Sequence, residues 1–507
     1  MKYEAVIGLE VHAQILTASK MFCACSAKFG EAPNAQTCPV CLGLPGALPV
    51  LNRRAVELAV RTALALGCTI APRSRFARKN YFYPDLPKDY QISQYEEPLA
   101  VHGALEFVVG GATRRVGIRR LHVEEDAGKL VHVGTMDRAE SSLVDLNRCG
   151  VPLMEIVSEP DLRTPDEAAE YMRQLRALLV YLEACDGNME EGSLRCDANV
   201  SIRPAGGTGF GVKTEVKNMN SFRNVQRALE FESQRQAKAL DEGGQVVQET
   251  RLWDAESGTT RSMRGKEEAH DYRYFPEPDL VPLAPAPDWI EEIRRSLPEL
   301  PEARRARFVA QYGLPEYDAR VLTDTRARAD YFEAVARVAK DPKQAGNWVK
   351  DELLGHLNKE GKEIEQSPIA PERLGELLEL LGKGTISGKI AKAVFEEMHA
   401  TGKAPADIVR DKGLTVITDA GALEAIVESV LGQFPQAVAE FKEAVRYKPG
   451  YAEAHDYLGA AFYASGRFAE AVTEFTETVR LKPDLAGARD NLELARRALA
   501  GQAKGTR

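Results

Sequence analysis

A carboxylate and an imidazole stand two residues apart near the start of the chain, at Glu10 and His12. Apolar residues alternate with them through the segment 7–12, a period-two pattern that predicts a half-buried strand with both side chains on its polar face. A single histidine on a strand is more often a core residue than a ligand. Beside a carboxylate, however, His12 favours a metal site.

Two later segments show the same alternation with more charge on the polar face. The polar positions of the segments 193–203 and 212–217 carry Ser193, Arg195, Asp197, Asn199, Ser201, Arg203, Lys213, Glu215 and Lys217. A sheet with one side in water explains any one such strand. Several strands with carboxylates, amides and cations together instead predict a surface that holds Mg²⁺ and phosphate oxygens.

Three further acids are candidates for the same surface. Glu124 and Glu125 are adjacent in "LHVEEDAGK", so strand alternation turns their side chains to opposite faces and predicts that only one is a ligand. Glu155 lies in the apolar run "LMEIV", where a carboxylate is costly unless it ligates a metal or forms a salt bridge. Both explanations of Glu155 remain open.

Four of the eight cysteines form two close pairs, Cys23 with Cys25 and Cys38 with Cys41. Two pairs separated by a short loop suit a tetrahedral zinc site, and four thiolates leave no open position for catalysis. We therefore expect a structural zinc knuckle. Four unligated thiols that happen to cluster are the alternative.

Composition and charge exclude some classes of protein. The chain has 44% hydrophobic residues, 28% charged residues and a net charge of −9, typical of a globular protein and not of one that grips nucleic acid over its whole surface. Local basic clusters do occur at 73–79 and 114–120. The N-terminus lacks a secretory signal pattern and no apolar run is long enough to cross a membrane, so we expect a cytoplasmic protein.

Common nucleotide and nucleophile motifs are missing from the sequence. It contains no G-x-x-x-x-G-K-[ST] phosphate loop and no G-x-G-x-x-G after a strand, so a nucleotide must be held by side chains on a sheet. No G-x-S-x-G elbow or Ser-Lys amidase pattern stands out.

The candidate residues belong to a strand-rich region that extends to about residue 290. Helical periodicity predicts helices over 53–66 and 165–184, the second capped by Thr164. After the Pro-rich break at 281–289, charged helical segments are predicted over 289–311, 327–340 and 370–400.

From about residue 431 the chain contains a 34-residue repeat. Ala437, Phe441, Val445, Lys448 and Pro449 recur as Ala471, Phe475, Val479, Lys482 and Pro483. A helix-turn-helix repeat of this length resembles a tetratricopeptide repeat (TPR). The two units are fewer than the roughly three that a free-standing array needs, so we expect them to lean on a neighbour or a partner.

Eight segments, taken in order, resemble the signature blocks of one family. They are "VIGLEVHAQ", "CPVCLGLPGALPVLN", "KNYFYPDLPKDYQISQY", "HVEEDAGK", "DLNRCGVPLMEIVSEPD", "GNMEEGSLRCDANVSIR", "EVKNMNSF" and "KEEAHDYRYFPEPDL". From residue 3 to about residue 430 the chain resembles the GatB family, the B subunits of the aspartyl/glutamyl-tRNA amidotransferases.

The resemblance implies an enzyme that binds ATP, Mg²⁺ and the acceptor end of a mischarged tRNA. It implies phosphorylation of the side-chain carboxylate of Glu-tRNA(Gln) or Asp-tRNA(Asn), and then amidation to Gln-tRNA(Gln) or Asn-tRNA(Asn). The residues it assigns to the metal and to catalysis are Glu10, His12, Glu124, Glu125 and Glu155. Weaker assignments to phosphate and nucleotide are Arg195, Asp197, Asn199, Lys213, Glu215 and Lys217. Tyr272, Arg273 and Tyr274 either line the pocket near the tRNA 3′ end or form a rigid loop.

Partners follow from the same resemblance. Because no amidase signature is present, ammonia is expected from the glutaminase subunit of the amidotransferase, with a small third subunit completing a heterotrimer. The fold expected is α+β, in four parts. They are a catalytic domain over 1–290 on a mostly antiparallel sheet with the zinc knuckle at 23–41, a helical connecting domain over 291–345, a partial helical tail domain over 346–430, and the TPR-like repeat over 431–507.

The resemblance ends near residue 430, where family members continue with a basic helical segment that helps to hold tRNA. We therefore expect weaker or differently arranged tRNA binding. The repeat either docks a protein partner or caps the shortened tail helices.

Two other classes of protein are open to test. A zinc-bearing, tRNA-binding scaffold with decayed catalytic residues would form no phosphorylated intermediate. A metal-dependent hydrolase that uses Glu10 and His12 would turn over without ATP, and it leaves the other charged strand faces unexplained.

Overall fold

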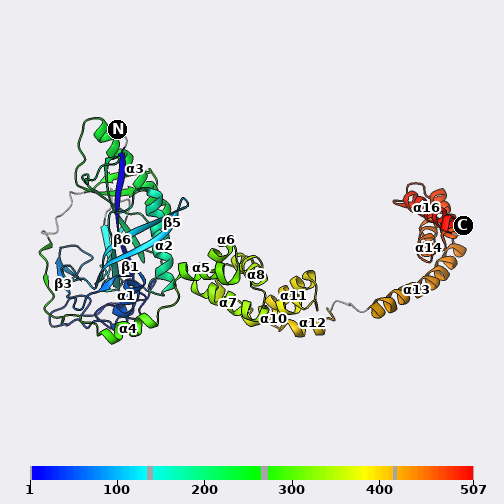
Figure 1. Cartoon of the computed structure of the whole chain (residues 1–507), viewed down its shortest axis with the longest axis horizontal. Coiled ribbons are helices and arrows are strands. Elements are labelled where there is room, and N and C mark those ends of the chain that lie inside the picture. Colours follow the sequence, from blue (N-terminus) through cyan, green and yellow to red (C-terminus); the bar gives the residue numbers. More distant parts are fainter. Residues whose placement is uncertain (1–2, 134–140, 264–271, 415–419, 506–507) are drawn as a thin grey trace. The chain divides into compact units, whose positions relative to one another are not determined.

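The computed structural model describes residues 3–133, 141–263, 272–414 and 420–505, and it forms two compact units, one up to Gly375 and one from Glu376 (Figure 1). Residues 264–271, which include the start of the block "KEEAHDYRYFPEPDL", lie outside the described residues, as do residues 415–419 of the expected tail domain. None of the described helices is both long enough and apolar enough to cross a membrane.

A nine-stranded sheet organises the first unit, in the order β13-β12-β11-β10-β1-β9-β6-β5-β2. Its strands are β1 (Tyr3–Gln14), β2 (Thr69–Ile70), β5 (Ala100–Val109), β6 (Ala112–Glu125), β9 (Pro152–Ser158), β10 (Leu194–Pro204), β11 (Thr214–Lys217), β12 (Thr250–Asp254) and β13 (Thr259–Ser262). All neighbouring pairs are antiparallel except β11 with β12. The predicted α+β fold with a mostly antiparallel sheet is confirmed.

Two smaller sheets complete the strands among the described residues. One has the order β14-β3-β4 and consists of β3 (Ala77–Asn80), β4 (Tyr90–Ser93) and β14 (Phe275–Pro276). The other pairs β7 (Lys129–Val133) with β8 (Ser141–Asp145).

Three helices cover the apolar face of the large sheet: α1 (Arg53–Ala65), α2 (Pro165–Tyr181) and α3 (Phe222–Asp241). Figure 1 shows α2 and α3 side by side beside the sheet, and they contact each other. Leu9 and Val11 are fully buried against these helices, in one core cluster with Leu58 and Leu175. Burying this face leaves the alternate residues of each strand on the opposite face.

Local sequence explains where the helices and the longest hairpin begin and end. The side-chain oxygen of Asn52 accepts hydrogen bonds at the start of α1, and Thr164 accepts one from the backbone N–H of Glu167 at the start of α2. Both helices agree with the predicted segments. Gly110 and Gly111 have positive φ values of 57° and 78° and form the two-residue turn between β5 and β6.

The remaining helices follow residue 286. They are α4 (Pro287–Arg295), α5 (Pro301–Tyr312), α6 (Glu316–Leu322), α7 (Arg326–Ala339), α8 (Pro342–Asn347), a π-helix (Trp348–Leu353), α9 (Leu354–Glu360), a 3₁₀ turn (Ile364–Gln366), α10 (Pro371–Gly382), α11 (Gly388–Thr401) and α12 (Pro405–Asp411). The predicted helical segment 289–311 is two helices, because Pro301 begins a new one. Ile293 of α4 is buried in the core of the sheet domain, so this helix packs on that domain and does not separate from it.

The C-terminal helices have a small core of their own. The helices are α13 (Ala420–Tyr447), α14 (Ala452–Ala464), α15 (Phe468–Leu481) and α16 (Ala488–Gly505). Leu458, Phe462 and Phe475 are buried in a cluster with Val438 and Leu492. The repeated positions Phe441 and Val445 pack against this cluster, as a helix-turn-helix repeat requires.

Candidate active site

Neighbouring strands bring four acidic and imidazole side chains together on the polar face of the sheet. The register pairs His12 of β1 with Glu155 of β9, and Glu155 with His122 of β6. Glu124 follows His122 by two residues on β6, so it points to the same face. The cluster therefore spans three adjacent strands that are far apart in sequence.

Distances within this cluster fit a cation site. The Nε2 atom of His12 lies 3.4 Å from Oε2 of Glu155 and 3.9 Å from Oε1 of Glu124. One ligand atom from each of His12, Glu124 and Glu155 falls within 4.8 Å of the others. Two carboxylates and an imidazole are a donor set that a divalent cation such as Mg²⁺ or Mn²⁺ accepts. Ser93 fixes one carboxylate by donating its hydroxyl to Oε2 of Glu124 at 2.8 Å.

His122 lies behind the two carboxylates and was not predicted from sequence. Its Nε2 atom is 3.3 Å from Glu155 and 3.4 Å from Glu124, while its buried Nδ1 atom has no hydrogen-bond partner among the described residues. The period-two alternation that separates the faces of Glu124 and Glu125 also puts His122 on the face of Glu124, and this was the available signal.

Acids and imidazoles in the cluster shift each other's pKa values. Burial opposes a charged His12, but the hydrogen bond and the charge of Glu155 outweigh it and raise the His12 pKa above its ordinary 6.5. For His122 the charges and hydrogen bonds of Glu155 and Glu124 outweigh burial and raise the pKa to about 9. Burial also opposes ionised Glu155, yet the two imidazoles hold its pKa well below the ordinary value. Without a metal, the imidazoles therefore keep the protons that balance these carboxylates.

A second cluster of charged side chains lies on the same polar face, on β1, β10 and β11. Glu10 is paired in register with Asp197, and Asn199 with Glu215. The ammonium group of Lys217 lies 2.6 Å from Asp197 and 3.5 Å from Glu215. Thr250 donates its hydroxyl to Glu215 at 2.8 Å. This arrangement offers carboxylates and a cation to a polar ligand.

Residues of both groups, Asn199 excepted, line one cavity of about 470 Å³. Its lining residues are Glu10, His12, Lys79, Ser93, Gln94, Arg120, His122, Glu124, Glu155, Asp197, Glu215, Lys217, Thr250, Met263, Tyr272 and Tyr274. The lining residue Tyr274 stacks on Tyr95, with the ring centroids 4.2 Å apart. A cavity of this volume suits a nucleotide-sized ligand.

Five candidate residues lie outside this lining: Glu125, Arg195, Asn199, Lys213 and Arg273. Glu125 turns away from the cluster, forms an ion pair with Lys88 and accepts the backbone N–H of Ile92 at 2.9 Å. Arg195 pairs with Asp126 at 2.8 Å. Asn199 donates to Glu10 at 2.8 Å, so its contact with the site is indirect.

Lys213 is exposed and immediately precedes the first residue of β11. Arg273, between the two lining tyrosines, is also exposed. Of the adjacent pair Glu124 and Glu125, Glu124 reaches the cluster, because Glu125 pairs with Lys88 on the other face. Lys79 belongs to the lining, although the sequence marked it only as part of a basic cluster.

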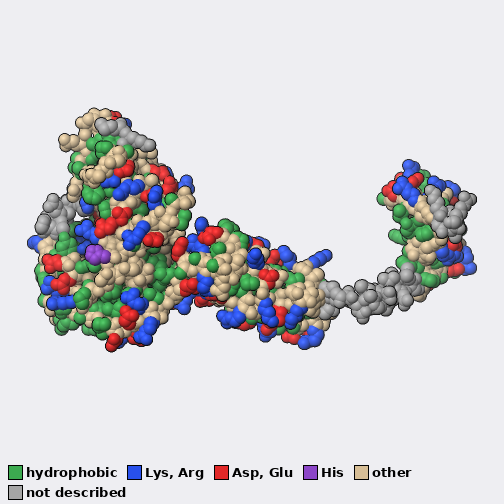
Figure 2. Space-filling model, in the orientation of Figure 1, with side chains coloured by type: hydrophobic (Ala, Val, Ile, Leu, Met, Phe, Trp, Pro, Cys, Tyr) green, Lys and Arg blue, Asp and Glu red, His purple; other side chains and the backbone are tan. Residues whose placement is uncertain are grey.

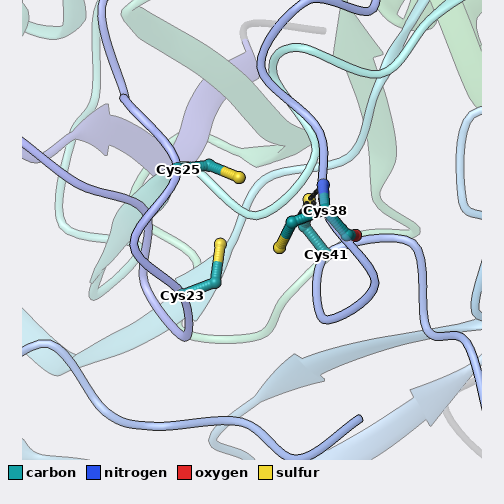
Figure 3. Close-up of side chains that lie close together, drawn as sticks. All are labelled: Cys23, Cys25, Cys38 and Cys41. Carbon is teal, nitrogen blue, oxygen red and sulfur yellow. Dashed lines mark hydrogen bonds between the residues drawn. The ribbon is translucent and has the colours of Figure 1, made fainter.

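The four cysteines form a second, separate metal-binding geometry. Their sulfur atoms point toward a common space in Figure 3, and all four lie within 4.8 Å of one another. A hydrogen bond from Cys23, the backbone N–H of Cys38 and the ammonium of buried Lys20 lower the pKa of the Cys41 thiol to about 5. The cluster thus presents at least one thiolate and three further sulfurs, a donor set for a tetrahedral metal.

Comparison with known proteins gives matches over most of the chain. The family model described as the GatB/GatE catalytic domain matches residues 5–291, a GatB domain model matches 330–447, and a TPR repeat model matches 431–466. Proteins named as the B subunit of aspartyl/glutamyl-tRNA(Asn/Gln) amidotransferase are similar in sequence. Those of Thermodesulfovibrio yellowstonii, Carboxydothermus hydrogenoformans and Geobacter sulfurreducens are 58%, 59% and 59% identical, each over 87% of this chain and 92% of the relative.

We expect binding of Mn²⁺ at the His12–Glu124–Glu155 cluster to strengthen as the pH is raised from about 6 to about 9. The imidazole must lose its proton to bind a cation, and its raised pKa extends this competition above pH 6.5. Isothermal titration without nucleotide measures the dissociation constant at each pH. The variant His12→Asn should bind more weakly and with a flatter pH dependence. A dissociation constant that stays the same across this range in the unaltered protein contradicts the assignment.

Proposed function

The chain belongs to the GatB family, the B subunits of the aspartyl/glutamyl-tRNA(Asn/Gln) amidotransferases, and from this premise we propose that its cavity activates the side-chain carboxylate of a mischarged tRNA with ATP. The product is Gln-tRNA(Gln) or Asn-tRNA(Asn). The observation that carries the proposal is the row of acidic, imidazole and ammonium side chains across five adjacent strands, β11-β10-β1-β9-β6, which lines a single cavity.

The proposed reaction has two steps, a phosphoryl transfer and an amidation. A carboxylate oxygen of the attached Glu or Asp attacks the γ-phosphorus of ATP, the bond to the β–γ bridging oxygen breaks, and ADP leaves. Ammonia then attacks the acyl carbon of the resulting acyl phosphate, phosphate leaves, and the nitrogen loses a proton to give the amide. Phosphorylation supplies the leaving group that a carboxylate lacks.

The chain's own residues bind and orient the reactants. His12, Glu124 and Glu155 are the proposed Mg²⁺ ligands, and the ion, when bound, offsets negative charge on the phosphoryl oxygens. Glu10, Asp197, Glu215 and Lys217 form the neighbouring part of the cavity and are the proposed contacts to the nucleotide and its counter-ions. Tyr272 and Tyr274, which line the cavity and contact each other, are the proposed contacts to the acceptor end of the tRNA.

We assign ammonia production to a partner glutaminase and propose a heterotrimer that a small third polypeptide completes. The relatives' name as one subunit of an amidotransferase supports a complex of several subunits. Glu-tRNA(Gln) and Asp-tRNA(Asn) are the proposed substrates. The cytoplasm, where aminoacyl-tRNAs are used, is the proposed location.

Reconstitution of the chain with the glutaminase and the small third polypeptide tests the activity. The complex should convert Glu-tRNA(Gln) or Asp-tRNA(Asn) to the amide only with ATP. Glu10→Gln and His12→Ala should each lower ADP formation by roughly 100-fold or more, the effect typical of losing a group that stabilises transferring charge, while glutamine hydrolysis is retained.

The matched control for these variants is Glu57→Gln, a carboxylate on α1 that pairs with Arg54 and Arg61 of the same helix and lies outside the cavity lining. It should keep full activity. Full activity in both site variants, or turnover without ATP, contradicts the proposed function.

We further propose that the four-cysteine cluster holds a structural Zn²⁺. Elemental analysis of the purified protein should give about one zinc per chain. Cys38→Ser should lose the metal and lower the thermal unfolding temperature, whereas Cys68→Ser, a buried cysteine outside the cluster, should keep the zinc. A full zinc content in Cys38→Ser would exclude this site.

The C-terminal helices are proposed to have little part in holding tRNA. Basic and acidic residues are nearly equal in number from residue 431 onward, and Figure 2 shows both kinds interspersed on the visible face. Several basic side chains are paired, including Arg467 with Glu470 and Arg480 with Glu477. Exposed Tyr447, Tyr451 and Tyr457 suit a protein partner better than a phosphate backbone.

Affinity for mischarged tRNA, measured at matched salt against the Thermodesulfovibrio yellowstonii relative, tests this role of the tail. We expect weaker binding and a shallower dependence on salt, because fewer phosphates are neutralised. An affinity and a salt dependence equal to those of the relative would contradict the proposal that the C-terminal helices have little part in holding tRNA.

A further inference from the structure

Within the part of the chain that the structure describes, one cation of the active-site cavity, Lys79, has no hydrogen-bond or ion-pair partner. Lys79, Arg120 and Lys217 are the lysine and arginine side chains that line the cavity. Lys217 is paired with Asp197 and Glu215. Arg120 donates to the backbone oxygen of Tyr95 and lies over that residue's ring. Among the described residues, no acceptor or carboxylate pairs with the ammonium of Lys79.

Aromatic rings hold the Lys79 ammonium in place. It lies 4.8 Å from the ring centroid of Tyr272 and 5.9 Å from that of Tyr81. Cation–π contacts of this kind position an ammonium group without satisfying its three N–H donors. The donors therefore remain available to an acceptor that enters the cavity.

The neighbouring cation, Arg78, is by contrast paired with carboxylates. Arg78 precedes Lys79 on β3, and its side chain points to the opposite face of this short strand. There the guanidinium binds both oxygens of Glu277, at 2.7 and 2.9 Å, and reaches Asp279 at 3.2 Å. One face of β3 thus carries a fully paired structural cation. The other face presents Lys79 to the cavity.

The charges of the cavity favour an anion that contacts both Lys79 and a cation bound at the carboxylate cluster. Burial alone lowers the pKa of Lys79, but neighbouring ionisable groups, Glu124 and Glu155 among them, outweigh it, so the ammonium stays charged at neutral pH. Once a divalent cation occupies the carboxylate cluster, its two charges offset those of Glu124 and Glu155, and these carboxylates no longer balance the charge of Lys79. Two cations across a shared cavity are stable when an oxyanion lies between them.

We propose that Lys79 binds the oxyanion that is transferred in this cavity, donating hydrogen bonds to the phosphoryl oxygens as they pass from ATP to the acyl carboxylate. This inference rests on the proposed function, since it names a contact to the group that the proposed reaction transfers. Lys79 reaches this group from the small β14-β3-β4 sheet, whereas the cluster belongs to the large sheet. The transferred group is then held by both sheets.

Kinetics of Lys79→Met in the reconstituted heterotrimer test the inference. The variant should form ADP with Glu-tRNA(Gln) on the order of 100-fold more slowly in kcat, since it loses a charged donor to the transferring group. Lys79→Arg, which keeps a charge and donors, should recover part of this loss. A larger change in KM for ATP assigns the contact to the γ-phosphate before transfer, and a larger change in KM for the tRNA assigns it to the acyl carboxylate.

Cation binding separates this role from a structural one. Removing a positive charge near the cluster should leave the Mn²⁺ affinity of Lys79→Met unchanged or several-fold tighter in the absence of nucleotide. Weaker Mn²⁺ binding together with lost turnover would show a structural role and overturn the inference. The control Lys238→Met, an exposed lysine on α3, should match the unaltered protein in both assays.

Measurement of ADP formation also separates the proposed function from the proposed role of Lys79. If the unaltered complex forms no ADP with mischarged tRNA, the proposed function fails. If the unaltered complex is active and Lys79→Met keeps a kcat within about threefold of it, the function stands and the role of Lys79 is wrong.

Discussion

Two carboxylates buried side by side are the constraint on which this site depends. Glu124 is 3% exposed and Glu155 is 9% exposed, and like charges so placed are costly unless cations accompany them. The protein supplies His12 and His122 at distances of 3.3–3.9 Å, which keep both carboxylates ionised. Protons on the imidazoles and a bound divalent cation are alternative ways of balancing the same charge. A site built in this way is prepared to exchange the protons for a metal.

The sheet makes this arrangement possible because one of its faces packs in the apolar core while the other carries the charged residues. Leu9, Val11 and their neighbours are buried under α1, α2 and α3, and this burial sets the register of the strands. A slip of one residue would turn Glu10 and His12 into the apolar core. The same hydrophobic packing that stabilises the domain therefore fixes the positions of the charged residues on the opposite face.

Sequence patterns predicted the strand faces well, and the contacts between strands poorly. Alternation alone placed Glu10, His12 and Asp197 on one polar face, and the observed register brings them to one cavity. His122 was missed because its importance comes from β9, which lies between β1 and β6 in space and is distant from both in sequence. Arg195 lies on the expected strand, but its long side chain is drawn to Asp126. Lys79 reaches the cavity from a separate small sheet, and strand periodicity contains no information about that packing.

Electron spin-echo spectroscopy of bound Mn²⁺ tests the central claim most directly, because it detects nitrogen coordinated to the ion. With Mn²⁺ in place of Mg²⁺, the unaltered protein should show nitrogen modulation from a coordinated imidazole, and His12→Ala should lose it while keeping the signal of a bound ion or releasing the ion altogether. A tightly bound Mn²⁺ with only oxygen ligands in the unaltered protein, or an identical nitrogen signal in His12→Ala, would contradict the assignment of the cation to this cluster.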